Sequence, residues 1–209
     1  MIREVTLLNN KMIKSKNITQ KLVLLAILTA IVVALQILAI FTRPFFPMFS
    51  ITLVLVPIVI GAALLGIYAG AWLGLAFGFA VLISGDAAPF LIIDPIGTVL
   101  VVLLKGMFAG LAAGIVYKLI ERKNRTVAAI SAAVICPVVN SAVFIIGSYI
   151  FFLPTLTEWG AARGYTNVTA YIFLGFVGLN FIVELIINLA LSPTVVRLIQ
   201  YRIDSKLSE

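Results

Sequence analysis

The sequence predicts an all-α integral membrane protein with six transmembrane helices and both termini in the cytoplasm. Its composition is the first reason, since 63% of the 209 residues are apolar and only 11% are charged. A soluble domain is nearer half apolar and about a quarter charged. The second reason is a series of apolar segments near the length of about 20 residues that a helix needs to cross a bilayer. The third is the placement of the basic residues.

Basic residues concentrate in alternate polar segments. Five precede or open the first apolar segment, four lie at 118–125 and three follow the last apolar segment. The intervening loops hold only two basic residues, Arg43 and Arg163. Because basic loops stay in the cytoplasm, this alternation places both termini inside. The net charge of +7 therefore reflects membrane topology, and it does not indicate a nucleic-acid-binding surface.

The spans follow from hydropathy and from this charge pattern. The first covers 21–41. The charge-free segment 51–84 is too long for one helix and just long enough for two of about 17 residues each. A break is needed, because a single helix would place the basic loop 118–125 outside. We expect it at 66–70, the stretch from Gly66 to Gly70. The remaining spans are predicted at 96–119, 126–150 and 169–191.

The spans are predicted to form one membrane domain, residues 21–200. Residues 1–20 are predicted to be a cytoplasmic segment that lies on the membrane surface or is disordered, and 201–209 a cytoplasmic tail. The outer loops are expected at 42–50, 85–95 and 151–168.

Small residues recur at four-residue spacing in three segments. The glycine ladders are Gly66, Gly70, Gly74 and Gly78, and Gly106, Gly110 and Gly114. They predict close helix packing inside the bundle. The first span carries Ala26, Ala30 and Ala34 on one helical face. This alanine ladder either packs inside the bundle or docks a separate protein.

Two ionisable residues, Lys105 and Glu184, fall inside spans, where a charge is costly and indicates function by default. At 1.5 Å rise per residue, Lys105 lies at the depth of Asn140 and Asn180 in the outer half of the membrane. These groups predict the floor of a pocket open to the outside. The structural alternative is a Lys105–Glu184 ion pair with interhelical asparagine hydrogen bonds.

The outer loops hold aromatic and acidic residues, including Phe45 and Phe46. An interfacial aromatic belt is the default explanation for Trp159. Asp86 and Asp94 are candidate helix caps, and Asp94, directly before Pro95, fits a cap well.

Catalytic and metal-binding motifs are absent from the sequence. It has no histidine, and Cys136 is its single cysteine, expected to be buried and inert. A disulfide within the chain, a histidine or cysteine metal site and a Ser–His–Asp triad are therefore excluded. No phosphate-binding P-loop is present either. We predict no enzyme activity and no cofactor, so ATP-driven transport would require a separate motor.

These features resemble the substrate-binding (S) components of energy-coupling factor (ECF) vitamin transporters. The resemblance covers residues 20–200 and is carried by the alanine ladder and by the stretch 61–74, GAALLGIYAGAWLG, followed by Asp86. It implies a protein of the bacterial cytoplasmic membrane that captures a vitamin from outside. The pocket would be formed by the last three spans and capped by the first and third outer loops. It also implies docking on a membrane scaffold with two ATPases.

On this resemblance, Ala26, Ala30 and Ala34 would form the docking surface. The candidate substrate-binding residues are Lys105, Asn140, Asn180, Glu184, Asp86 and Trp159. A lysine in the pocket favours an anionic ligand, because an unpaired buried ammonium is costly. Pantothenate is the leading candidate, while lipoate, folate and biotin stay open. Riboflavin fits less well, since few aromatic residues are expected at this depth. The alternative function is a stand-alone carrier or channel with Lys105 and Glu184 as an ion relay.

Overall fold

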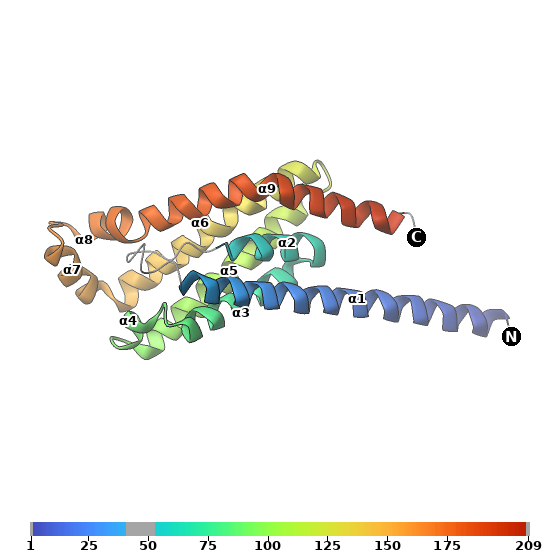
Figure 1. Ribbon diagram of the computed structural model, residues 1–209, viewed down its shortest axis with the longest axis horizontal. Coiled ribbons are helices and arrows are strands. Elements are labelled where there is room, and N and C mark those ends of the chain that lie inside the picture. Colours follow the sequence, from blue (N-terminus) through green and yellow to red (C-terminus); the bar gives the residue numbers. More distant parts are fainter. Residues whose placement is uncertain (1, 41–52, 208–209) are drawn as a thin grey trace.

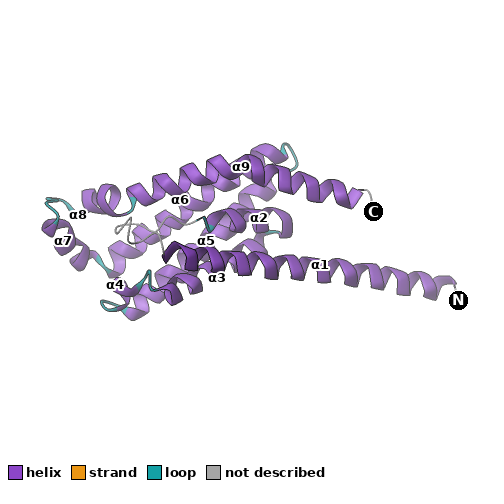
Figure 2. Ribbon diagram, viewed as in Figure 1, coloured by secondary structure: helices purple, strands orange, loops and turns teal. Residues whose placement is uncertain are grey.

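The computed structural model describes residues 2–40 and 53–207, and every regular element in these two ranges is helical, as Figure 2 shows. The predicted all-α class is therefore confirmed for the part of the chain that is described. The whole predicted first outer loop, 42–50, including Arg43, Phe45 and Phe46, lies outside the described residues.

The described elements form an elongated bundle (Figure 1). In chain order they are α1 (Ile2–Ala39), α2 (Leu55–Leu65), α3 (Ile67–Ser84), α4 (Ala88–Leu91), α5 (Pro95–Ile120), α6 (Arg125–Phe151), α7 (Leu153–Ala162), α8 (Val168–Ala170), the π-helical segment η2 (Tyr171–Phe176) and α9 (Gly178–Leu207). The start of α1 and the end of α9 lie at one end of the bundle, and α4, α7 and α8 lie at the other.

Among the described residues, five segments are helical and apolar enough to cross a membrane. They are Ile18–Ala39, Ile67–Ser84, Pro95–Ile120, Arg125–Phe151 and Val168–Leu191. The helix α2 has 11 residues. It rises about 16 Å, roughly half of the hydrocarbon core. The second span is therefore shorter than the expected length, and both a sixth crossing and the cytoplasmic location of the termini stay predictions.

The break in the charge-free segment lies at Gly66, at the edge of the predicted range 66–70. Gly66 joins α2 to α3 with a φ of 102° and a ψ of 179°. Glycine adopts this conformation readily, whereas an L side chain is strained there. The backbone conformation of this single glycine thus divides the long apolar segment into two helices.

The helices α3 and α5 pack along a seam of glycines. A methyl group on Gly74 would overlap the carbonyl oxygen of Gly106, and one on Gly70 would overlap that of Gly110. A methyl group on Gly78 would also meet the backbone of α5, although less tightly, at 2.9 Å from the carbonyl oxygen of Val102. The predicted packing of the glycine ladders inside the bundle is confirmed at these positions. Gly66 is the exception, since it forms the break, and a methyl group there would meet no described atom within 4 Å.

Three segments differ from the sequence prediction. The last span is not one α-helix, because α8 and η2 precede α9. The outer loop 151–168 contains α7. Residues 2–20 continue the first span within α1, so they are helical and not a separate element.

Candidate functional site

Lys105 lies on α5 between two aromatic rings. Its Nζ is 5.1 Å from the ring centroid of Phe144 on α6 and 5.7 Å from that of Phe77 on α3. Both rings attract the ammonium group through their negatively charged faces. The structure therefore places the Lys105 cation beside two aromatic faces, one from α3 and one from α6.

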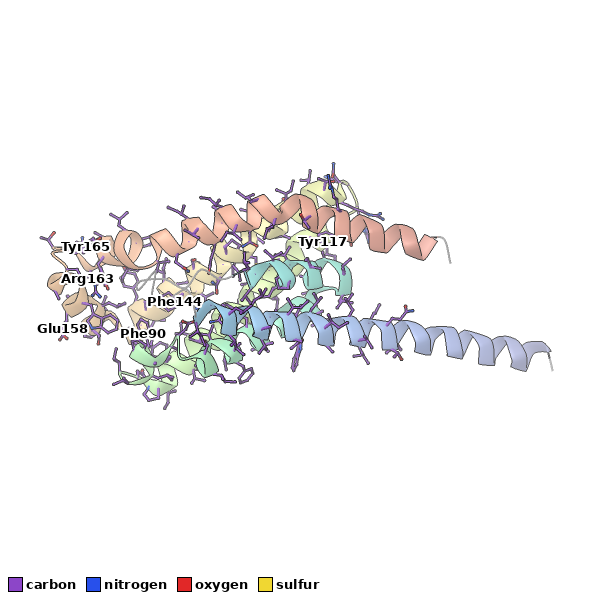
Figure 3. The ribbon with its side chains drawn as sticks, in the orientation of Figure 1. Phe90, Tyr117, Phe144, Glu158, Arg163 and Tyr165 are labelled. Atoms are coloured by element: carbon purple, nitrogen blue, oxygen red, sulfur yellow. The ribbon has the colours of Figure 1, made fainter. Side chains whose placement is uncertain are left out.

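An aromatic cluster, of which Figure 3 labels Phe90 and Phe144, lies toward the end of the bundle formed by α4 and α7, and its Phe144 ring is one of the two beside Lys105. Its centre is Phe90, whose ring centroid is 6.0 Å from Phe144, 4.8 Å from Phe152 and 5.6 Å from Trp159. The Phe90–Phe144 pair is edge-to-face, at 86°. We call Phe90, Phe144, Phe152 and Trp159 the aromatic cluster. Few aromatic residues were expected at the depth of Lys105, and the structure places two rings beside it, those of Phe77 and Phe144.

Polar side chains lie on α6 and α9, two helices that pack against each other. Within α9, the Nδ2 of Asn180 donates to Oε1 of Glu184 at 3.2 Å, and the Nδ2 of Asn188 donates to the carbonyl oxygen of Glu184 at 2.9 Å. The Asn180 bond is thus within one helix, and not between helices as the structural alternative expected. On α6, Asn140 is buried, and its Oδ1 has no hydrogen-bond partner within the described residues.

A buried amide oxygen without a partner costs about 1–3 kcal/mol. Asn140 therefore offers an acceptor for a hydroxyl or N–H group that enters the bundle. Whether Asn140, Asn180 and Glu184 contact a substrate stays a prediction.

Asp86 is tied to α1 and does not cap a helix. Gln36 of α1 is fully buried, and its Nε2 donates to Oδ2 of Asp86 and, at 3.2 Å, to Oγ of Ser84. The Ser84 hydroxyl donates to the carbonyl oxygen of Val81 at 3.1 Å. Gln36 is absent from the sequence-based candidates, although it is the one amide in an otherwise apolar part of the first span.

Asp94, by contrast, is the predicted cap. Its Oδ1 accepts a hydrogen bond from the backbone N–H of Gly97 at 2.9 Å, at the start of α5. The cap fixes the point where the chain turns from α4 into the helix that carries Lys105.

The alanine ladder faces away from the bundle. Ala26, Ala30 and Ala34 are exposed, whereas Leu28 and Val32 on the other side of α1 are buried. The ladder lines an open groove of about 710 Å³. On the α3 side the groove is lined by Trp72. The Nε1 of Trp72 donates a hydrogen bond to Oγ1 of Thr29 on α1, at 3.2 Å. Within the described residues the ladder is a surface feature and not an internal seam.

A comparison with known protein families now places the chain. The family model of the ECF transporter substrate-specific component matches residues 20–196. The chain belongs to this family. The substrate-specific component is a substrate-binding subunit of a membrane transporter, and not an enzyme. The suspected family is therefore confirmed, and no curated protein or solved structure matches the chain.

Proposed function

We propose that this substrate-specific component captures pantothenate at the outer face of a bacterial cytoplasmic membrane. The observation that carries the proposal is Lys105, an intramembrane cation next to the aromatic cluster. An anionic ligand would compensate a charge that is otherwise costly inside a bilayer. The end of the bundle that holds α4 and α7 would be the side of entry.

Pantothenate matches the chemistry of the candidate site group by group. Its carboxylate complements the ammonium of Lys105, and its hydroxyl and amide N–H groups suit the Oδ1 of Asn140, to which no described residue donates. Its two methyl groups suit the apolar faces of Phe90 and Trp159. Biotin, lipoate and folate share the carboxylate. The argument against riboflavin is weaker, because aromatic rings do flank Lys105.

Identification of the bound molecule tests this assignment. The protein would be purified from its host, and the small molecule that co-purifies would be identified by mass spectrometry. Equilibrium dialysis with radiolabelled pantothenate would follow, with the other four vitamins as competitors. We expect pantothenate in the purified protein and saturable binding. Displacement by another vitamin at a lower concentration would transfer the assignment to that vitamin.

The groove beside the alanine ladder is the proposed docking surface for the membrane scaffold of the energising module. Without a hydrophobic driving force between helices in lipid, small residues allow the close backbone approach that such contact needs. The partner would bring the two ATPases that this chain lacks. Both termini and the basic loop 118–125 would then lie on the cytoplasmic side, as the charge pattern predicts.

A bulky residue in this groove should separate binding from transport. Ala30→Trp is expected to abolish association with the scaffold and uptake in reconstituted vesicles, because the indole fills the groove. Ligand affinity should be unchanged, since Ala30 faces away from Lys105. Ile31→Trp is the matched control, as Ile31 is exposed but does not line the groove.

Two results would contradict this interpretation. Loss of ligand affinity in Ala30→Trp would make the ladder part of the binding fold. Uptake by vesicles that contain this chain alone, driven by an ion gradient, would instead support the stand-alone carrier that uses Lys105 and Glu184.

A further inference from the structure

We propose that Arg163 is an entry site for the carboxylate of the ligand, at which the anion binds before it reaches Lys105. This inference rests on the proposed function, because it concerns the route by which the same ligand enters. Arg163 directly follows α7, at the end of the bundle that the charge pattern predicts to lie outside. Figure 3 labels it at the same end as Phe90 of the aromatic cluster.

Two contacts hold the guanidinium of Arg163. Its Nη1 donates to the backbone carbonyl oxygen of Trp159 at 3.2 Å, and its Cζ is 5.7 Å from the ring centroid of Tyr171. Tyr171 is itself buried, and a methyl group on Gly160 of α7 would already meet its ring at 3.1 Å. A guanidinium on an aromatic face still presents N–H groups along its edge, and these match the planar geometry of a carboxylate. Arg163 is therefore an exposed cation in a preformed position.

Arg163 is also remote from the other surface cations. Apart from Lys105, the remaining basic residues of the two described ranges lie in α1, at 118–125 and in α9. Glu158, the nearest carboxylate along the chain, is five residues before Arg163. At 3.6 residues per turn, its side chain leaves α7 about 140° away around the helix. An anion that approaches this end from water thus meets Arg163 as the first cation of the described residues.

A continuous series of contacts joins Arg163 to Lys105. The ring centroid of Trp159, whose carbonyl group accepts from Arg163, is 5.6 Å from that of Phe90. The Phe90 ring is 6.0 Å from that of Phe144, and the Phe144 ring is 5.1 Å from Nζ of Lys105. The aromatic cluster thus lies between an exposed cation and an intramembrane one. A ligand with an apolar body would contact these rings while its carboxylate passes from Arg163 to Lys105.

The structural alternative is that Arg163 only caps the C-terminal end of α7. A basic side chain near the end of a helix is stabilised by the last carbonyl groups, and the bond to Trp159 is of this kind. Such a cap acts on the stability of α7, whereas an entry site acts on the rate of anion association. Arg163→Gln keeps an amide donor and removes the charge, while Arg163→Lys keeps the charge. The two variants therefore separate the alternatives.

The test measures association of radiolabelled pantothenate with the full chain, by rapid filtration in nanodiscs of a neutral phospholipid. We expect Arg163→Gln to lower the association rate constant about fivefold at low ionic strength, because charges at the rim of a site act chiefly on association. The dissociation rate should be nearly unchanged. The difference should shrink as salt is added, since salt screens an exposed charge. Arg163→Lys should associate at close to the parent rate.

Arg122→Gln is the matched control. It removes the same charge from an exposed position in the turn between α5 and α6, at the other end of both helices, and should associate at the parent rate. Three results would overturn the proposal: a parent-like rate in Arg163→Gln, a slower rate that does not respond to salt, or an equally slow rate in Arg163→Lys. If Arg163→Gln does not fold, Ala162→Glu places a carboxylate beside an intact Arg163 and should slow association in the same salt-dependent way; an unchanged rate would contradict the entry site.

A second readout does not depend on the identity of the substrate. In a chain with Trp72→Phe, Trp159 is the remaining tryptophan, and its carbonyl group is bonded to Arg163. Quenching of its fluorescence by iodide, relative to neutral acrylamide, reports the local attraction for anions. This ratio should fall in Arg163→Gln and stay constant in Arg122→Gln. If pantothenate does not bind to the parent chain, the substrate assignment fails, while the iodide ratio still decides whether Arg163 attracts anions; an unchanged ratio in Arg163→Gln overturns its role.

Discussion

Replacement of Gly74 by valine is expected to prevent this protein from folding. A single Cβ at Gly74 would already overlap the carbonyl oxygen of Gly106 on α5, and valine adds two further methyl groups. Backbone atoms cannot move aside as a flexible side chain does, so α3 and α5 must separate. Overpacking typically costs about 1–3 kcal/mol and occasionally more. A native domain is stable by about 5–15 kcal/mol, so a separated seam removes much of this stability.

Size-exclusion chromatography and thermal unfolding in lipid nanodiscs would measure the effect. Gly74→Ala should be folded with a lower midpoint, and Gly74→Val should be aggregated or absent from the membrane. Val99→Leu is the control, because it adds a methylene to the exposed side of α5 and should leave the midpoint unchanged. A Gly74→Val protein as stable as the parent would disprove the backbone contact between α3 and α5.

The second large effect is expected from Lys105→Met. Methionine keeps an unbranched apolar chain between Phe77 and Phe144 but removes the charge. Leaving a ligand carboxylate without its partner should cost about 2 kcal/mol or more, a loss of roughly 30-fold in affinity for pantothenate. Thermal stability should be unchanged or higher, since a charge inside the membrane is costly to bury.

Equilibrium dialysis and thermal unfolding on the same preparation separate these two outcomes. Lys118→Met is the matched control, because Lys118 lies at the exposed far end of the same helix. Its affinity should equal that of the parent chain. If Lys105→Met binds pantothenate as tightly as the parent, Lys105 is not a ligand-binding residue. If Lys105→Met is strongly destabilised instead, the structural ion pair with Glu184 becomes the better explanation.

Much of the candidate site depends on residues that are remote in sequence. Lys105 and Glu184 were identifiable because a charge inside an apolar span is conspicuous in any sequence. Phe77 and Phe144 were not, because a phenylalanine in an apolar span can face either the lipid or the interior of the bundle. Gln36 was also passed over, although an isolated amide in an apolar span is the same kind of signal as Lys105.

The sequence by itself determined the features that depend on neighbours along the chain. Hydropathy established the helical membrane class, Asp94 before Pro95 established a helix cap, and the four-residue spacing of glycines established a close-packed seam. Only the tertiary structure decided that α2 is short, that the alanine ladder faces outward, and that Gln36 reaches Asp86. The physical reason is that periodicity, capping and length are local properties of a helix. The rotation of each helix and the meeting of side chains about 50 residues apart depend on how the whole bundle packs.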